Sequence, residues 1–202
     1  MKSKKTLLWE YAEAIITALI LALVIRAYVI QAFKIPSGSM IPTLLIGDHI
    51  LVNKFIYGTT IPFTDKRTLV LRKPEKGDII VFKFPENPKK DFIKRVIATE
   101  GDVVEERNKL IYLNGKAVAE PYAQHVDSLL RSGMNDPRDN FGPVTVPKDK
   151  LFVMGDNRDQ SYDSRYWGFV DLKAVLGKAL IIYWSWDPDN MARFNRIGRL
   201  IR

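Results

Sequence analysis

The sequence feature that most constrains the fold is a series of short runs rich in β-branched and aromatic residues. They cover residues 50–56, 78–84, 92–98, 109–113, 151–154 and 179–184. Gly, Pro and Asp clusters separate the runs, as is typical of strands joined by turns. The pair Asn114 and Gly115, between two apolar runs, predicts a type I′ hairpin. We therefore predict a mainly β fold for this part of the chain.

An apolar segment near the N-terminus predicts a membrane anchor. Residues 14–25 contain no charge, and apolar character resumes over 27–33, beyond Arg26. One helix over residues 14–33 would span roughly 30 Å, about one bilayer core. Arg26 lies near the end of this segment, where it can snorkel to the headgroups. The alternatives are an amphipathic helix in the membrane plane and a cleaved signal peptide, although no small-x-small site follows the apolar run.

Two further segments have no clear periodicity. Residues 123–147 are polar and rich in Gly, Pro, Asn and Asp, and we interpret them as part of a small loop-rich insertion over residues 103–147. Near the C-terminus, Phe194, Ile197 and Ile201 alternate with four arginines. This pattern is typical of a basic amphipathic turn on a membrane surface, and a solvated basic tail fits it equally well.

Composition narrows the partners and the chemistry. The formal net charge is +8, which favours nucleic acid or anionic lipid. The sequence has no recognisable nucleic-acid reading element, so we expect membrane lipid rather than nucleic acid. It has no cysteine, which excludes a disulfide framework, a thiolate nucleophile and a Cys-based metal site.

A candidate nucleophile follows the apolar segment, in residues 36–42 (Pro-Ser-Gly-Ser-Met-Ile-Pro). Proline fixes φ and glycine permits unusual backbone angles, so this segment can hold a hydroxyl beside free backbone N–H groups. A nucleophilic serine and its oxyanion hole require this arrangement. Taken alone, a segment of this kind is more often a turn, because turns favour the same residues.

A nucleophilic serine needs a base, and the sequence offers lysine or histidine. Lys94 lies in a predicted strand whose two faces both carry apolar residues, and burial of a lysine lowers its pKa toward that of a base. The histidines are His49, at the start of a predicted strand, and His125, in the insertion. His49 stays an alternative because a Ser-His-Asp triad is defined by geometry rather than by sequence position.

A third polar segment, residues 155–165, contains three aspartates and two arginines. It does not have the spacing of a calcium-binding EF-hand loop, since Arg158 and Gln160 stand at ligand positions. Arg158 and Arg165 can instead pair with the aspartates to brace the loop, which leaves Ser161 free to orient another group. We expect neither a metal nor another cofactor.

Three motifs together resemble the signature boxes of bacterial type I signal peptidases, a family of Ser-Lys serine proteases. They are residues 36–40 (Pro-Ser-Gly-Ser-Met), residues 77–82 leading to Ile93-Lys94-Arg95, and residues 155–159 (Gly-Asp-Asn-Arg-Asp) continuing through Ser161 to residues 164–168 (Ser-Arg-Tyr-Trp-Gly). They occur in this order from the anchor nearly to the C-terminus. The loop-rich insertion is the part that the resemblance covers least well.

The resemblance implies roles for particular residues. Ser39 would be the nucleophile and Lys94 the general base, with Ser161 orienting Lys94. The Ser39 N–H and the Ser37 hydroxyl would form the oxyanion hole. A supporting salt bridge would join Asp163 and Arg165. The pockets for small substrate side chains would be lined by Ile35, Pro36, Met40, Leu44, Phe92 and Ile93.

It also implies antiparallel β-sheets around a substrate groove and an endopeptidase that removes signal peptides from exported preproteins. The expected place is the bacterial cytoplasmic membrane, with residues 1–13 cytoplasmic, residues 14–33 as a single transmembrane anchor and residues 34–202 as an extracytoplasmic catalytic domain. Some members have two spans and a longer insertion, whereas this sequence predicts one span. We expect the partners to be preprotein signal peptides and membrane lipid, and the protein to be a monomer.

Overall fold

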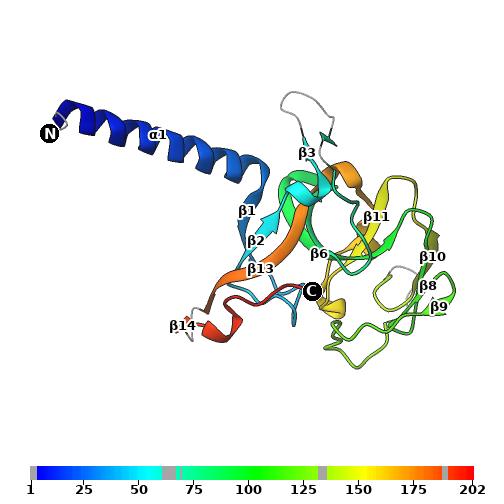
Figure 1. Cartoon of the computed structure of the whole chain (residues 1–202). Helices are drawn as coiled ribbons and strands as arrows, with labels where there is room; N and C mark the ends of the chain where they lie inside the picture. The colour runs from blue at the N-terminus through cyan, green and yellow to red at the C-terminus, as the bar shows by residue number, and fades with distance from the viewer. Residues whose placement is uncertain (1–3, 61–66, 69, 132–135, 188–190) are drawn as a thin grey trace.

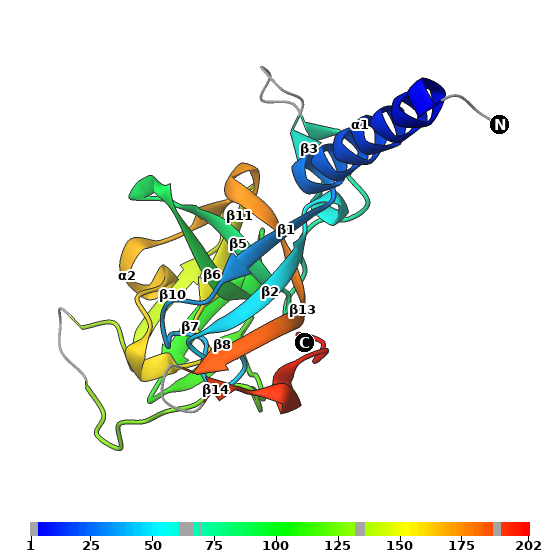
Figure 2. The same cartoon turned by 90° about the vertical axis from the view of Figure 1, so that its left-hand side faces the viewer.

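A long N-terminal helix leads into a β-rich body in the computed structural model, which describes residues 4–60, 67–68, 70–131, 136–187 and 191–202 (Figure 1). The helix α1 covers Lys4–Tyr28 and projects away from the sheets, as the turned view also shows (Figure 2). The described short helices are α2 (Ser164–Trp167) and the 3-10 turns η1 (Phe55–Tyr57), η2 (Arg158–Gln160), η3 (Leu172–Ala174) and η4 (Phe194–Arg196).

The main sheet has eight strands, all paired antiparallel, in the order β1-β2-β13-β5-β6-β11-β12, with β14 added to β13. Its strands are β1 (Ile30–Lys34), β2 (Asp48–Asn53), β5 (Ile79–Phe84), β6 (Asn87–Thr99), β11 (Lys150–Met154), β12 (Val170–Asp171), β13 (Val175–Asp187) and β14 (Met191–Ala192). The prediction of a mainly β, antiparallel fold is confirmed. The edge position of β1 matters for the site, because β1 leads directly into the segment that contains Ser39.

A second sheet, of four strands in the order β10-β7-β8-β9, occupies the predicted insertion. Its strands are β7 (Val103–Arg107), β8 (Leu110–Leu113), β9 (Lys116–Ala117) and β10 (Phe141–Thr145), and a further pair joins β3 (Thr59–Thr60) to β4 (Arg67–Thr68). Asn114 and Gly115 both have positive φ between β8 and β9, which confirms the hairpin. Residues 123–147, predicted as part of a loop-rich insertion, contain the strand β10, in which Val144 and Thr145 pair with β7.

Apolar side chains on both faces of the main sheet form the core. One cluster includes Ile35, Met40 and Leu44 from the Ser39 segment, packed with residues of β2, β5 and β13. A second cluster, on other positions of β5 and β6, includes Phe82 and Val96. A third lies between the main sheet and the smaller one. The Ser39 segment is therefore anchored by core side chains on either side of the hydroxyl.

The predicted helix over residues 14–33 is wrong at its C-terminal end. The helix stops at Tyr28, and Ile30–Lys34 pairs residue by residue with β2. The sheet supplies the backbone hydrogen-bond partners for this run that a continued helix would have supplied. Within the described residues, no helix combines the length and the apolar character needed to cross a membrane.

The C-terminal segment differs from both structures predicted for it, the amphipathic turn on a membrane surface and the solvated basic tail. Beyond η4 the chain runs beside β13, where Ile201 N–H donates to the Leu180 carbonyl and Ile201 is buried. Arg196 is also buried, and its guanidinium binds the Asp48 carboxylate. Two of the four arginines thus point inward, since Arg193 likewise donates to Ser185.

Candidate active site

The structure brings Ser39 and Lys94 together from positions 55 residues apart in the sequence. Ser39 lies in the connection between β1 and β2, here named the Ser39 loop (residues 35–47), and Lys94 lies on β6. The Nζ atom of Lys94 donates a hydrogen bond to Ser39 Oγ at 2.6 Å. This contact joins a hydroxyl to an amine at the distance that proton transfer requires.

Lys94 is only 4% exposed, and this burial changes its acidity. Removal of the ammonium from water lowers the pKa of Lys94 from 10.5 to about 8, even though the charges of Asp163 and Asp156 favour the protonated form. The Phe92 ring lies 5.8 Å from Nζ. Among the described residues, no carboxylate lies within 4.0 Å of Nζ to form an ion pair. The lowered pKa therefore makes a larger fraction of this amine neutral near pH 7 than of an exposed lysine.

Arg95, the next residue on β6, is buried as well but has a full set of partners. Its guanidinium forms two hydrogen bonds with the Asp156 carboxylate, at 2.8 and 2.7 Å, and a third with the Gly77 carbonyl. The Tyr122 ring stacks on it, with 3.8 Å between the guanidinium carbon and the ring centroid. Such a paired arginine keeps its charge, whereas the unpaired lysine beside it is pushed toward neutrality.

The segment after β11 holds the Ser39 loop in place. Asn157 N–H donates to the Ser39 carbonyl at 3.1 Å, and its side-chain amide donates to the Gly38 carbonyl. Thr43 Oγ1 donates to Asp156 Oδ2 at 2.5 Å. A Cβ atom on Gly155 would lie only 2.3 Å from the Ser39 carbonyl oxygen, so glycine is required for the two backbones to approach this closely.

The predicted supporting residues lie beside Lys94. Arg165 and Asp163 form a buried two-point ion pair, with 2.9 Å from Nε to Oδ1 and 3.0 Å from Nη2 to Oδ2. Ser161 is buried, and a Cβ on Gly155 would lie 2.3 Å from its Oγ atom. No hydrogen bond joins Ser161 to Lys94 in the part of the chain that the structure describes. The predicted contact with Lys94 is therefore absent from this arrangement, although the hydroxyl lies next to the Ser39 loop.

The predicted pocket residues fall into two groups. Ile35, Met40 and Leu44 belong to one buried cluster, against which Ile93 packs. Phe92 packs on the other face of β6 with the Phe82 cluster, because neighbouring strand residues point to opposite faces. Pro36 and Ser37 are exposed at the start of the Ser39 loop. Of the predicted pocket residues, Ile35, Met40, Leu44 and Ile93 therefore share one cluster.

The edge of β6 beside these residues is open. β6 pairs with β5 over Asn87 to Arg95, but β11 covers its other edge only over residues 95–99. Across the described ranges, no strand pairs with residues 91–94 on that second edge. An extended peptide can add there by main-chain hydrogen bonds.

The sequence patterns gave no individual role to several residues at the site, namely Thr43, Arg95, Tyr122 and Asn157. Asp156 pairs with Arg95, and not with Arg158 or Arg165. Arg158 differs from the prediction, since it pairs with Glu120 of the insertion and not with an aspartate. The alternative base His49 packs against Tyr183, with 5.9 Å between ring centroids, and no hydrogen bond to Ser39 is present among the described residues. No cluster of three or more metal-ligating side chains occurs in the described part of the chain.

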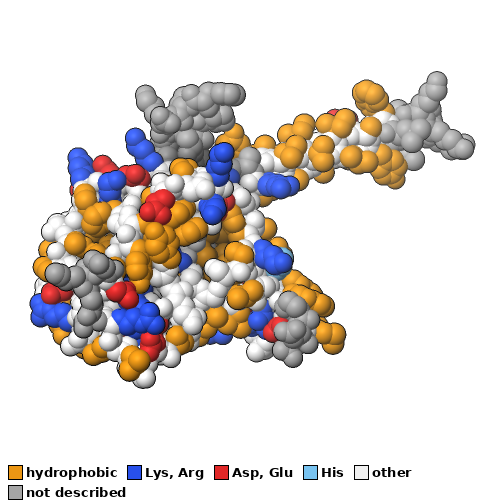
Figure 3. All heavy atoms as spheres, turned by 180° about the vertical axis from the view of Figure 1, so that it is seen from behind, with side chains coloured by type: hydrophobic (Ala, Val, Ile, Leu, Met, Phe, Trp, Pro, Cys, Tyr) orange, Lys and Arg blue, Asp and Glu red, His pale blue; other side chains and the backbone are white. Residues whose placement is uncertain are grey.

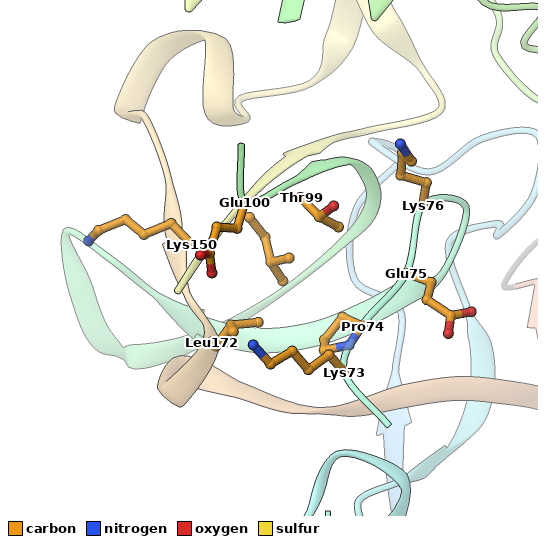
Figure 4. Close-up of a pocket in the computed structure, with 9 residues that line it drawn as sticks. Lys73, Pro74, Glu75, Lys76, Thr99, Glu100, Lys150 and Leu172 are labelled. Atoms are coloured by element: carbon orange, nitrogen blue, oxygen red, sulfur yellow. The ribbon is translucent and has the colours of Figure 1, made fainter. Parts of the chain in front are cut away.

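A separate cavity of about 270 Å³ lies at the far ends of β6 and β11 (Figure 4). Lysines and glutamates surround its mouth, and its lining residues are Lys73, Pro74, Glu75, Lys76, Thr99, Glu100, Lys150, Leu151 and Leu172. It contains no residue of the predicted site. The Thr99 hydroxyl in its lining donates to the Asp102 carboxylate, and the short contact between a hydroxyl and a buried amine is found at the Ser39 loop.

A serine hydroxyl hydrogen-bonded to a buried lysine is an arrangement that also occurs in serine hydrolases that use a lysine in place of histidine. The comparisons with known proteins identify the family. Residues 8–184 match the family model described as "Signal peptidase, peptidase S26". The chain therefore belongs to the signal peptidase family, and it is a serine endopeptidase.

Two relatives with curated names agree with this assignment. The chain is 37% identical to "Signal peptidase I" of Pseudomonas aeruginosa, over 97% of this chain and 80% of that protein. It is 39% identical to "Probable signal peptidase I-2" of Synechocystis, over 87% and 72%. A crystal structure of a signal peptidase I from Enterococcus faecalis, 35% identical, covers 53% of this chain and 97% of its own with a TM-score of 0.43. Family membership supports the removal of signal peptides as the reaction.

Proposed function

We propose that Ser39 and Lys94 form the catalytic dyad of an endopeptidase that removes N-terminal signal peptides from exported preproteins, cutting after small residues. The observation that carries the proposal is the 2.6 Å hydrogen bond between the two side chains, together with the burial of Lys94. With a pKa of about 8, roughly one Lys94 in ten is neutral at pH 7. For an exposed lysine the fraction is about one in three thousand.

In the proposed mechanism, neutral Lys94 accepts the Ser39 proton while Ser39 Oγ attacks the scissile carbonyl. The ammonium then protonates the leaving amine, and the signal peptide stays esterified to Ser39 as an acyl-enzyme. Lys94, neutral again, activates the water that hydrolyses the ester. Both steps use the same short contact between Nζ and the reacting oxygen.

The remaining site residues have supporting roles in this proposal. The Ser39 N–H and the Ser37 hydroxyl would donate to the oxyanion. Ser161 is buried next to the Asp163 carboxylate, and its hydroxyl would accept a hydrogen bond from the Lys94 ammonium. Asp163 and Arg165 brace the chain on either side of Ser164, which supports the adjoining Ser161 segment.

Small substrate residues fit the apolar side of the site. A substrate strand added to the open edge of β6 would alternate its side chains between the two faces. Those that point toward Ile35, Met40, Leu44 and Ile93, with Pro36 at the rim, would meet an already packed cluster with room for small groups only. Phe92 would flank the other face, beside Lys94.

We also propose that the protein works as a monomer attached to membrane lipid, with its catalytic part outside the cytoplasm. Hydrophobic side chains are exposed along α1 (Figure 3) and again near the end of β13, where Trp184, Trp186, Met191 and Phe194 are uncovered. Aromatic side chains of this kind favour the membrane interface. Attachment there would hold Ser39 close to the bilayer in which signal peptides are presented.

The test is cleavage of a preprotein that carries a small-x-small site by the detergent-solubilised full chain. We expect one cut after the second small residue, mapped by N-terminal sequencing of the product, and no cut by Ser39→Ala. Substrates with phenylalanine in place of either small residue should resist cleavage. Cleavage of these bulky substrates at the unaltered rate would contradict the proposed specificity, and full activity of Ser39→Ala would contradict the nucleophile.

A further inference from the structure

The Ser39 loop is held from two directions, and the second involves the C-terminal segment. On one side, Thr43 Oγ1 is fixed by Asp156. On the other, the carbonyl of the same Thr43 accepts a hydrogen bond from Arg196 Nη2 at 3.0 Å. Thr43 lies four residues after Ser39, so a displacement of Thr43 is transmitted to the nucleophile over one short turn, in which Leu44 N–H donates to the Met40 carbonyl.

The same arginine also fixes the end of the loop. Arg196 binds both oxygens of Asp48, with Nε to Oδ1 at 3.0 Å and Nη2 to Oδ2 at 2.5 Å. Asp48 in turn accepts hydrogen bonds from Leu45 N–H and from Ser185 Oγ. Asp48 is fully buried and Arg196 is 6% exposed, so this network is shielded from water, where charge-assisted bonds are strongest.

A second arginine adds to the contact between the two segments. Arg193 donates through Nη2 to the Ile46 carbonyl of the Ser39 loop and through Nε to Ser185 Oγ. The arginines that the sequence pattern associated with solvent or lipid are therefore used internally at positions 193 and 196. Arg199, three residues further on, has an exposed side chain.

We propose that Arg196 is a positioning residue for the cleavage reaction, which holds the Ser39 loop through the Thr43 carbonyl and the Asp48 carboxylate. The inference rests on the proposed role of Ser39. Arg196 does not touch the reacting atoms; it keeps Ser39 Oγ in line with Lys94 Nζ. Because small displacements of reacting groups slow catalysis strongly, its loss reduces kcat more than KM.

The experiment compares Arg196→Gln, Arg196→Lys and the matched control Arg199→Gln in the full chain, with the small-x-small preprotein as substrate. We expect kcat of Arg196→Gln, corrected for the folded fraction from circular dichroism, to fall roughly 10- to 100-fold. KM should change by less than about threefold, since the substrate contacts remain. Arg199→Gln should behave as the unaltered protein.

Arg196→Lys distinguishes a loss of positioning from a loss of folding. It also takes the place of Arg196→Gln if that variant does not fold. Lysine keeps a charge beside Asp48 but lacks the planar fork that reaches both Asp48 oxygens and the Thr43 carbonyl. We expect it to fold and to recover only part of kcat. The midpoint of the pH profile should stay in place in every variant, because Lys94 is untouched.

Three results would overturn the inference: kcat per folded molecule equal to that of Arg199→Gln in both Arg196 variants, a loss confined to KM, or a shifted pH midpoint. Failure of the underlying function is recognised separately, because it appears as activity in Ser39→Ala. If Ser39→Ala is inactive while both Arg196 variants are fully active, the positioning role alone is wrong.

Discussion

Lys94 and Arg95 are consecutive, buried residues of β6, and only Arg95 is paired with a carboxylate. Arg95 is matched by Asp156, whereas Lys94 meets the Ser39 hydroxyl. Burial without an ion-pair partner disfavours the charged form of an amine. The same strand thus holds one arginine that is bound to Asp156 and one lysine whose amine loses its proton more readily than that of an exposed lysine.

The first prediction concerns pH. The pKa of Lys94 in the free enzyme is about 8, so kcat/KM should rise about tenfold per pH unit below that value and level off above it. Only the neutral amine can take the serine proton, which sets the direction of the change. Steady-state cleavage between pH 6 and 10 measures this profile. A kcat/KM that is constant from pH 6 to 8 would exclude Lys94 as the base.

The second prediction concerns the free energy of unfolding of Lys94→Met. The folded pKa of Lys94 lies below the unfolded value of 10.5, so the lysine destabilises the fold fully below pH 8, and this cost disappears as the pH rises toward 10.5. Methionine removes the cost. We expect a gain of about 1–3 kcal/mol at pH 7.

This gain should shrink as the pH approaches 10.5, which urea unfolding of both proteins at pH 7 and at pH 10 would measure. The lost hydrogen bond to Ser39 opposes the gain but does not depend on pH in the same way. A stability difference that stays constant across this range would show that Lys94 is not buried as a destabilised ammonium.

The third prediction concerns the ion pair beneath the Ser39 loop. Asp156→Asn leaves the Arg95 charge buried without its counter-charge, and removal of one partner from such a pair costs about 3–5 kcal/mol of unfolding free energy. The control is Asp171→Asn, which removes a carboxylate that is 61% exposed and paired with Lys150. That change should cost less than about 0.5 kcal/mol. Equal effects of the two substitutions in urea unfolding would contradict the structural role given to Asp156.

The fourth prediction concerns the close backbone approach at Gly155. Alanine there places a methyl group against the Ser39 carbonyl and Ser161, so the Ser39 loop must move and cleavage should fall by about 100-fold or more. The control Gly101→Ala sits at positive φ with open space around it. It should lower stability modestly while kcat per folded molecule stays the same. Similar kcat values for the two variants would contradict the predicted displacement.

The sequence patterns predicted the strands and several side chains of the site, because each leaves a local signal. Alternation in β6 placed Lys94 and Arg95 on opposite, apolar faces, and the Asn114 turn signal located the hairpin. They did not predict the end of α1. Residues 30–34 are apolar enough for a helix, and only the pairing with β2, from Ile30 with Asn53 to Lys34 with His49, makes them a strand.

Long-range polar contacts are the other part that local patterns miss. Arg196 and Asp48 are separated by 148 residues, and nothing near Arg196 in the sequence indicates that it turns inward. Likewise, Phe92 and Ile93 were grouped in one set of pockets, whereas the strand period places them on opposite faces of β6. Their charge alone predicted that the C-terminal arginines contact solvent or lipid. In the structure, Arg193 and Arg196 instead bind Ser185 and Asp48.

The most direct test of the dyad is the cleavage rate of Lys94→Met beside those of Ser39→Ala and His49→Gln, with all three shown to be folded by circular dichroism. The account predicts that both dyad variants lose cleavage by several orders of magnitude and that His49→Gln cuts at close to the unaltered rate. Cleavage by Lys94→Met at the unaltered rate, or its loss in His49→Gln, would contradict the assignment of Lys94 as the base.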